Sequence, residues 1–211
     1  MEQIWKGYQT ANGGFIPAVY SEFFDVFSKP NAETLAPHYS IDHAIALEPG
    51  FKLPCGRIYT LLEFELRMLK AYIETNLAKG FNQRSSSGVA APILLAKKQD
   101  GGLWLCVEYW ALNVGTIKIR YPLPLILKML DRLRGAWIFT KLHFRNAYHP
   151  IRNEDGEEFK TTLRTRYDQF QCRVLPFSVA NAAATFQAYI DDCLRPYIDD
   201  FAIGYLWNIL I

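Results

Sequence analysis

The sequence predicts an α+β fold in which antiparallel strands are combined with helices. Apolar residues recur at three- and four-residue spacing between Leu62 and Leu77, which is typical of an amphipathic helix. Two apolar runs, Val89–Lys98 and Leu103–Tyr109, flank the sequence Gln-Asp-Gly-Gly and predict a hairpin. Between Phe201 and Ile211 we expect an apolar strand, a two-residue turn at Tyr-Leu-Trp-Asn and a return strand.

Length and composition indicate a chain that buries a core. The 211 residues are 50% hydrophobic and 15% aromatic, which excludes a disordered type and suits one domain or two joined subdomains. No apolar run is long enough to span a membrane, and the first residues lack an apolar segment behind a basic one. We therefore expect no membrane partner and an intracellular location in an unspecified compartment.

The net charge of +2 hides a basic middle section. Residues 97–173 contain 14 Lys and Arg against 8 Asp and Glu, a net charge of +6, and several Trp and Tyr residues are interleaved with them. Cations with aromatic neighbours suit a surface that follows phosphates and stacks bases. A merely solvated surface has the same composition, so this feature alone does not decide between them.

The remaining elements follow from local signals. Residues 1–50 are rich in Gly and Pro and predict an extended arm, apart from two helical turns at Tyr20–Phe27. Thr60 and Glu63 match a capping box before the long helix, and Gly80 supplies its stop.

Three further elements are expected in the second half of the chain. Leu125–Leu133 and Val179–Arg195 are predicted helices, the second ended by Pro196. Phe159–Thr165 and Gln169–Leu175 predict a second hairpin.

Two segments resemble the halves of a polymerase active site. Residues 138–148 read Ile-Phe-Thr-Lys-Leu-His-Phe-Arg-Asn-Ala-Tyr, and residues 205–210 read Tyr-Leu-Trp-Asn-Ile-Leu. They are similar to Leu-Asp-Leu-Arg-x-Ala-Tyr and Tyr-Leu-Asp-Asp-Ile-Leu in the reverse transcriptase of gypsy-type long-terminal-repeat retrotransposons. Two more sequence motifs of that family are matched here. One is residues 105–113, which read Leu-Cys-Val-Glu-Tyr-Trp-Ala-Leu-Asn, and the other is residues 176–187, which begin Pro-Phe-Ser and end Thr-Phe-Gln.

The resemblance runs from about Val19 to Ile211 and implies how the predicted elements are arranged in the fold. It implies a right-hand polymerase fold: residues 1–50 form the arm, and residues 51–211 form fingers and palm, truncated before the thumb and RNase H. The palm sheet would contain strands from Ile138–Phe144, Gln169–Leu175 and Phe201–Ile211, backed by the two later helices. The hairpin at Val89–Tyr109 would project as the fingers.

The same resemblance places the metal ligands and finds them replaced. The family uses two Mg²⁺ ions held by carboxylates, and those positions are His143, Trp207 and Asn208 here. Mg²⁺ is a hard cation that prefers oxygen ligands, and the repulsion between two dications must be offset by negative charge. We therefore expect no intact catalytic residue, no bound metal and no cofactor.

Five other residues are candidates for contacts with nucleotides or nucleic acid. The resemblance assigns Lys97, Lys98 and Tyr148 to the nucleotide site, and Lys141 and Arg145 lie where they could touch nucleic-acid phosphates. Trp104 replaces an arginine of the family, and an indole cannot bind phosphate as a guanidinium does. Packing beneath the sheet explains Tyr148 equally well.

Two questions stay open at the level of sequence. The residues Tyr197-Ile198-Asp199-Asp200 also match the short form of the catalytic turn, although a helix and Pro196 precede them where a strand is needed. The chain is either an inactive reverse-transcriptase copy, a nucleic-acid-binding module retained without catalysis, or a structural relic of a transposable element. We expect weak, non-specific binding to nucleic acid along the basic middle section, because neutralising phosphates needs no intact active site. The oligomeric state is not predicted.

Overall fold

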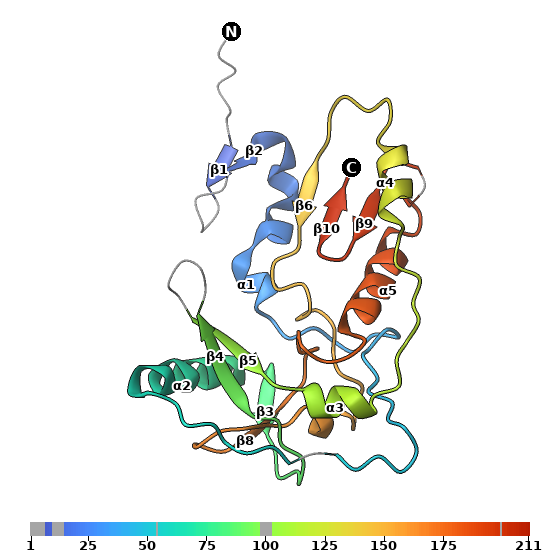
Figure 1. Cartoon of the computed structure of the whole chain (residues 1–211). Coiled ribbons are helices and arrows are strands. Elements are labelled where there is room, and N and C mark those ends of the chain that lie inside the picture. Colours follow the sequence, from blue (N-terminus) through green and yellow to red (C-terminus); the bar gives the residue numbers. More distant parts are fainter. Residues whose placement is uncertain (1–6, 10–14, 54, 98–102, 199) are drawn as a thin grey trace. The chain divides into compact units, whose positions relative to one another are not determined.

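The structure is a computed structural model that describes residues 7–9, 15–53, 55–97, 103–198 and 200–211 (Figure 1). The chain divides into two compact units, Met1–Thr34 and Leu35–Ile211. The first unit contains the antiparallel strands β1 (Gly7–Gln9) and β2 (Phe15–Pro17), the 3₁₀ helix η1 (Ala18–Phe27) and the short helix α1 (Lys29–Ala32). The helical turns predicted at Tyr20–Phe27 are thus confirmed, in 3₁₀ form.

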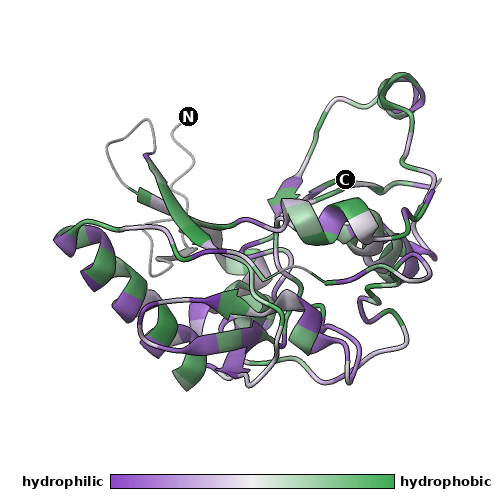
Figure 2. Ribbon diagram, turned by 60° about the horizontal axis from the view of Figure 1, so that its bottom comes forward, coloured by the Kyte–Doolittle hydropathy of each residue, from purple (hydrophilic) through white to green (hydrophobic). Residues whose placement is uncertain are grey.

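The first helix of the second unit is the predicted long helix, α2 (Glu63–Ala78). Figure 2 shows hydrophobic and hydrophilic residues alternating along this helix, and Leu69 and Ile73 are buried on its apolar face. Gly80 follows with a φ of 71°, the left-handed conformation that ends many helices. The predicted cap was displaced: the backbone N–H of Leu62, rather than Thr60, donates to the Glu65 carboxylate over 2.7 Å.

The fingers hairpin is confirmed as β4 (Ile93–Lys97) paired with β5 (Leu103–Val107). Its register joins Ile93 to Val107 and Lys97 to Leu103, while the turn at residues 98–102 lies outside the described part. The short helix α3 (Trp110–Gly115) follows β5.

A three-stranded antiparallel sheet has the order β6–β10–β9. It consists of β6 (Lys141–His143), β10 (Asn208–Leu210) and β9 (Ile203–Tyr205), and β9 and β10 are joined by two residues. Leu142 and Tyr205 therefore lie in one sheet, as expected. Figure 1 shows helix α5 (Ala182–Leu194) beside β9.

The strand expected at Gln169–Leu175 is in a different sheet, so that part of the predicted assembly was wrong. β8 (Gln169–Cys172) lies between β3 (Asn82–Arg84) and β7 (Leu163–Arg164), and the 3₁₀ helix η2 (Glu158–Thr161) precedes β7. The hairpin β7–β8 was predicted, but β3 was not. Turn residues indicate that two strands adjacent in sequence, such as β7 and β8, pair with each other. Which strand pairs with the other edge of β8 depends on tertiary packing.

Helix α4 (Ile126–Arg132) forms where it was expected but does not back the sheet by close packing. None of its side chains is buried, and Leu125, Met129 and Ile203 line a cavity of about 370 Å³ between this helix and β9. By contrast, α5 packs closely: a Cβ added to Gly204 of β9 would lie 2.6 Å from Ile190 Cγ2. Glycine at 204 therefore permits the close approach of sheet and helix.

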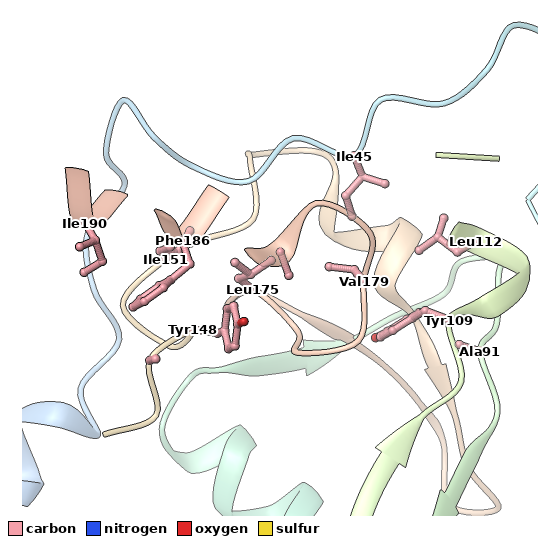
Figure 3. Close-up of a cluster of buried hydrophobic side chains, with 12 residues drawn as sticks. Ile45, Ala91, Tyr109, Leu112, Tyr148, Ile151, Leu175, Val179, Phe186 and Ile190 are labelled. Carbon is pink, nitrogen blue, oxygen red and sulfur yellow. The ribbon is translucent and has the colours of Figure 1, made fainter. Parts of the chain in front are cut away.

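Two apolar clusters stabilise the second unit. In the smaller, Leu69 and Ile73 of α2 pack with Leu163 and Phe170 of the sheet β3–β8–β7 and with Ile93 of β4. Figure 3 shows the larger cluster, in which Phe186 and Ile190 of α5 lie among side chains from loops and helices far apart in sequence. Its twelve buried members are Ile45, Ala91, Tyr109, Leu112, Ala147, Tyr148, Ile151, Leu175, Val179, Ala182, Phe186 and Ile190.

Residues 35–50 contribute to this second unit. Ile45 belongs to the larger cluster, and His43 is fully buried with its Nδ1 2.8 Å from Thr185 Oγ1 of α5. The backbone N–H of His43 donates to Arg152 O over 2.8 Å. The division of the chain at residue 50 remains a proposal about domain organisation. Within the described residues, each helix is too short or too polar to cross a bilayer.

Candidate functional site

The strands β6 and β10 bring two of the replaced carboxylate positions together. His143 and Asn208 are register partners across the antiparallel pair, and His143 Nδ1 lies 3.0 Å from Asn208 Oδ1. The backbone N–H of Phe144 donates to Trp207 O over 2.9 Å, which fixes the end of β6 against the turn before β10. The three positions predicted from separate motifs are therefore adjacent.

The turn between β9 and β10 has an unusual backbone conformation. Leu206 has a φ of 48°, in the left-handed region that few non-glycine residues adopt. Its backbone N–H donates to Gln187 Oε1 over 2.8 Å. Gln187 comes from α5 and is fully buried, and its Nε2 also donates to Gly204 O at 3.2 Å. One side chain thus bonds both the middle of β9 and the turn residue that follows the strand.

Gln187 was matched to the family only as the last residue of Thr-Phe-Gln, and its structural role was missed. Its Nε2 also lies 2.8 Å from Asp191 Oδ1, and Asp191 Oδ2 accepts a hydrogen bond from Tyr121 Oη at 2.7 Å. Burial, followed by this hydrogen bond, raises the pKa of Tyr121 to about 12. Gln187 precedes Asp191 by four residues on the same helix, and this spacing could have indicated that the two side chains contact each other. Asp191 therefore belongs to this network rather than to a solvated face.

The loop after β6 places aromatic rings beneath the site. Tyr148 is buried, and its ring lies 5.5 Å from Phe177 and 5.4 Å from Phe186. Burial raises the pKa of Tyr148. Phe144 meets Phe186 edge-on at 5.9 Å. Edge-to-face and tilted pairs of this kind fix ring positions, so the floor of the site is built by packing.

A cavity of about 540 Å³ opens beside these residues. His143, Phe144, Tyr148 and Trp207 line it on one side, and residues 104–107 of the fingers strand β5 line it on another. The site therefore lies between the hairpin β4–β5 and the sheet β6–β10–β9. Tyr148, predicted for the nucleotide site, is among its lining residues.

Among the described residues, the predicted cations Lys97, Lys141 and Arg145 do not line this cavity. Lys97 is exposed on β4, Lys141 is exposed on β6 opposite Leu210, and Arg145 is exposed just after β6. Lys98 lies outside the described residues. The three described cations are thus accessible to an external polyanion, and their roles remain predictions.

Two asparagine side chains fix the segments that lead into α5. Asn113 Nδ2 donates to Ser178 O over 2.8 Å, and the N–H of Ala180 donates to Asn113 Oδ1 over 2.7 Å. Asn181 has a φ of 68° and bonds the backbone of Ile117 and Ile119. Asn113 and Asn181 lie in the segments 105–113 and 176–187 that resemble the family, but sequence reasoning did not assign them this function.

The alternative motif at residues 197–200 has a different setting. Tyr197 O accepts hydrogen bonds from the N–H groups of Asp200, Phe201 and Ala202, so these residues form a compact turn after α5. Asp199 lies outside the described residues. The tip of a strand pair is formed by Leu206 and Trp207 instead.

Metal ligands do not gather at this site among the residues that the structure describes. No group of three His, Cys, Asp or Glu side chains there is close enough to hold an ion. His143 and Asn208 instead use a ring nitrogen and an amide oxygen on each other. The indole of Trp207 has only an N–H donor.

Solved reverse transcriptases have the same fold. Prototype foamy virus protease–reverse transcriptase superposes with a TM-score of 0.70 at 17% identity, covering 90% of this chain and 26% of that one. The foamy viral protein in complex with an RNA/DNA hybrid gives 0.68 at 16% identity, covering 93% and 27%. The complex with double-stranded DNA gives 0.65 at 19% identity, covering 84% and 32%.

Sequence comparison identifies the family. The Tf2-7 and Tf2-3 transposon polyproteins of Schizosaccharomyces pombe (strain 972 / ATCC 24843) are each 32% identical over 198 residues. The match covers 93% of this chain and 15% of either polyprotein, so the chain spans a small part of these relatives. A family profile described as reverse transcriptase (RNA-dependent DNA polymerase) matches residues 96–211. The strands β6, β9 and β10 all lie within that match, and the hairpin β4–β5 lies at its start. The chain belongs to the reverse transcriptase family of retrotransposon polyproteins.

Proposed function

We propose that this domain binds nucleic acid but does not catalyse polymerisation. The observation that carries the proposal is the 3.0 Å contact between His143 Nδ1 and Asn208 Oδ1 at two positions where the family has metal-binding carboxylates. Two neutral side chains that bond each other in this way supply no negative charge to balance a metal cation.

The residues at the site do not fit a pair of Mg²⁺ ions. Two-metal catalysis needs carboxylate oxygens that hold the ions about 3.5–4 Å apart. Imidazole suits softer metals, an indole does not ligate, and a neutral amide supplies one oxygen without charge. No step of the proposed function therefore passes through a metal.

Nucleic-acid binding does not depend on that chemistry. Lys97, Lys141 and Arg145 are exposed, and the section that contains them carries a net charge of +6. Neutralising phosphates releases counterions and requires no catalytic geometry. The foamy viral reverse transcriptases that share this fold were solved with double-stranded DNA and with an RNA/DNA hybrid, which supports a similar ligand here.

Binding to a template–primer duplex should weaken steeply with salt. We expect replacement of Lys97, Lys141 and Arg145 by alanine to reduce the slope of log K against log salt concentration by about 2–3, because each lost phosphate contact removes about one released ion. Fluorescence anisotropy with a labelled duplex at several salt concentrations measures this slope.

The matched control replaces three exposed cations outside the basic section, Lys52, Arg67 and Lys70. Arg67 and Lys70 face Glu63 and Glu74 on α2, at 3.6 and 3.9 Å. We expect this control to keep the slope of the unmodified domain. Equal slopes in all three proteins would contradict the assigned binding surface, and a cooperative thermal melt of each excludes unfolding as the cause.

Metal affinity tests the catalytic half of the proposal. We expect no Mn²⁺-dependent enhancement of water-proton relaxation by the unmodified domain. The triple substitution His143→Asp, Trp207→Asp and Asn208→Asp should create it, since hard cations require carboxylate oxygens. Binding by the unmodified domain that is lost on Asp199→Ala and Asp200→Ala would show that residues 197–200 are the functional turn.

A further inference from the structure

A second cavity lies between the turn that joins β7 to β8 and the helix α2. Its volume is about 230 Å³, and its wall includes Leu66 and Leu69 of α2, Ile93 of β4, and Arg164 and Arg166. Arg164 is the last residue of β7, and Arg166 lies in the turn. None of the described wall residues also lines the cavity beside the β9–β10 turn, so the two sites are separate.

The wall of this second cavity carries two positive charges. Among the described residues that form it there is no Asp or Glu. Neither arginine pairs with a carboxylate in the described part of the chain: Arg164 Nη1 lies 3.6 Å from Cys55 Sγ, a weak acceptor, and Arg166 is exposed. Two guanidinium groups on one wall repel each other, so an anion held between them is favoured.

The carboxylates closest in sequence to this wall have partners of their own. Asp168, in the same turn as Arg166, forms an ion pair with Arg84. At the start of α2, Glu63 lies 3.6 Å from Arg67, and Glu65 accepts a backbone N–H of its own helix cap. The positive charge of the wall is therefore not neutralised by these side chains.

The turn that carries the arginines is held in place by hydrogen bonds. Thr165 is buried, and its Oγ1 accepts the N–H groups of Tyr167 and Asp168, both at 3.0 Å. The same hydroxyl donates to Asp168 O over 2.8 Å. Tyr167 Oη donates to Leu66 O over 3.3 Å and so ties the turn to α2. A backbone that is already ordered loses little freedom when a ligand binds.

We propose that this second cavity binds a small phosphate monoester whose organic group is compact and apolar. The phosphate carries a charge of about −1.5 to −2 at pH 7, which matches the two guanidinium groups. Planar guanidinium groups bind phosphate oxygens through paired hydrogen bonds. The organic group lies against Ile58, Leu61 and Leu66 of the wall.

The size of the cavity limits the ligand. Its volume of about 230 Å³ is below the range of about 300–1,000 Å³ of most ligand pockets, so the organic group is no larger than about one ring. The inference goes beyond the proposed function, because it uses none of the three cations assigned to nucleic acid.

Calorimetric titration with phenyl phosphate at pH 7 tests this ligand class. Inorganic phosphate, which lacks the ring, should bind about tenfold more weakly because no apolar surface is buried. Benzoate, which has the ring but a single charge, should also bind about tenfold more weakly. Either control binding as tightly as phenyl phosphate would overturn the ligand class, and no binding of phenyl phosphate would overturn the site.

Substitutions locate the ligand. Arg164→Ala and Arg166→Ala should each weaken phenyl phosphate binding by at least about tenfold, since each removes charged hydrogen bonds. Arg67→Ala is the matched control, because Arg67 is an exposed arginine of α2 that lies outside the cavity wall. Equal effects of Arg166→Ala and Arg67→Ala would contradict the assigned site.

A competition experiment separates this site from the nucleic-acid surface. At constant ionic strength, saturating phenyl phosphate should leave the affinity for a template–primer duplex unchanged. Displacement of phenyl phosphate by the duplex, or a loss of about one unit of salt slope in Arg166→Ala, would assign the arginines to nucleic acid and overturn the proposal. Binding of phenyl phosphate without binding of the duplex would contradict the proposed function and support this inference.

A spectroscopic readout does not depend on any variant folding. In ¹⁵N-edited spectra of the unmodified domain, phenyl phosphate should shift the side-chain Nε–H resonances of Arg164 and Arg166. Arg152 is the internal control, because it is 4% exposed and its guanidinium already donates to Arg173 O and Ala36 O at 3.0 and 3.1 Å. Shifts at Arg152 without shifts at Arg164 and Arg166 would overturn the assignment.

Discussion

Replacing Gln187 by leucine is expected to lower the free energy of unfolding by about 2–4 kcal/mol, because each buried polar group left unpaired costs about 1–3 kcal/mol. Gln187 is fully buried and bonds the N–H of Leu206, the carbonyl of Gly204 and the carboxylate of Asp191. Leucine fills a similar volume but satisfies none of these groups. Urea denaturation followed by circular dichroism measures the loss.

The same substitution at Gln171 is the matched control. Gln171 is half-buried on β8, where its backbone pairs with Gln83 of β3. We expect a change within about 0.5 kcal/mol there, as for surface positions. If both variants lose the same stability, Gln187 does not hold the β9–β10 turn in the way the contacts indicate.

Acid should destabilise the domain through His43. Burial lowers the pKa of His43 to about 4 from its usual 6.5, against a smaller opposing effect of Glu157. The unfolded chain therefore binds a proton below pH 6.5, whereas the folded protein resists it down to about pH 4. Stability is full above pH 6.5 and falls by about 3 kcal/mol as the pH drops to about 4, at 1.36 kcal/mol per pKa unit.

The variant His43→Gln isolates this contribution. Glutamine does not titrate and can still bond the Thr185 hydroxyl, which lies 2.8 Å from His43 Nδ1. We expect its free energy of unfolding to depend less steeply on pH between 4 and 6.5 than that of the unmodified domain. Parallel curves across that range would show that His43 titrates normally.

Local signals predicted the elements that are held by local bonds. The hairpin β4–β5, the two-residue turn before Asn208 and the end of α2 at Gly80 all follow from periodicity and turn residues. The meeting of His143 with Asn208 was expected only through the family resemblance, since 65 residues separate them. The sequence pattern alone does not indicate which residues of two strands so far apart in the chain lie opposite each other.

What sequence did not predict depends on packing between distant segments. Strand β8 pairs with β3, whose three residues Asn-Gln-Arg show no strand pattern. His43 is buried and bonds Thr185, which lies 142 residues away in the sequence. The role of Gln187 depends on the left-handed conformation of Leu206, a residue type that gives no sign of it. The cavity beside Trp207 is likewise made by five separate segments, residues 72–82, 104–109, 143–149, 172–178 and 207.

Primer extension on an RNA template tests the central proposal most directly. With Mg²⁺ or Mn²⁺ the unmodified domain should extend no primer, because His143, Trp207 and Asn208 cannot hold the ions on which the reaction depends. The same preparation must melt cooperatively, which shows that it is folded, and must bind the duplex with salt-dependent affinity, which shows that it contacts the template–primer. Metal-dependent extension by this protein would contradict the proposal, and its loss on Asp199→Ala and Asp200→Ala would assign it to the other motif.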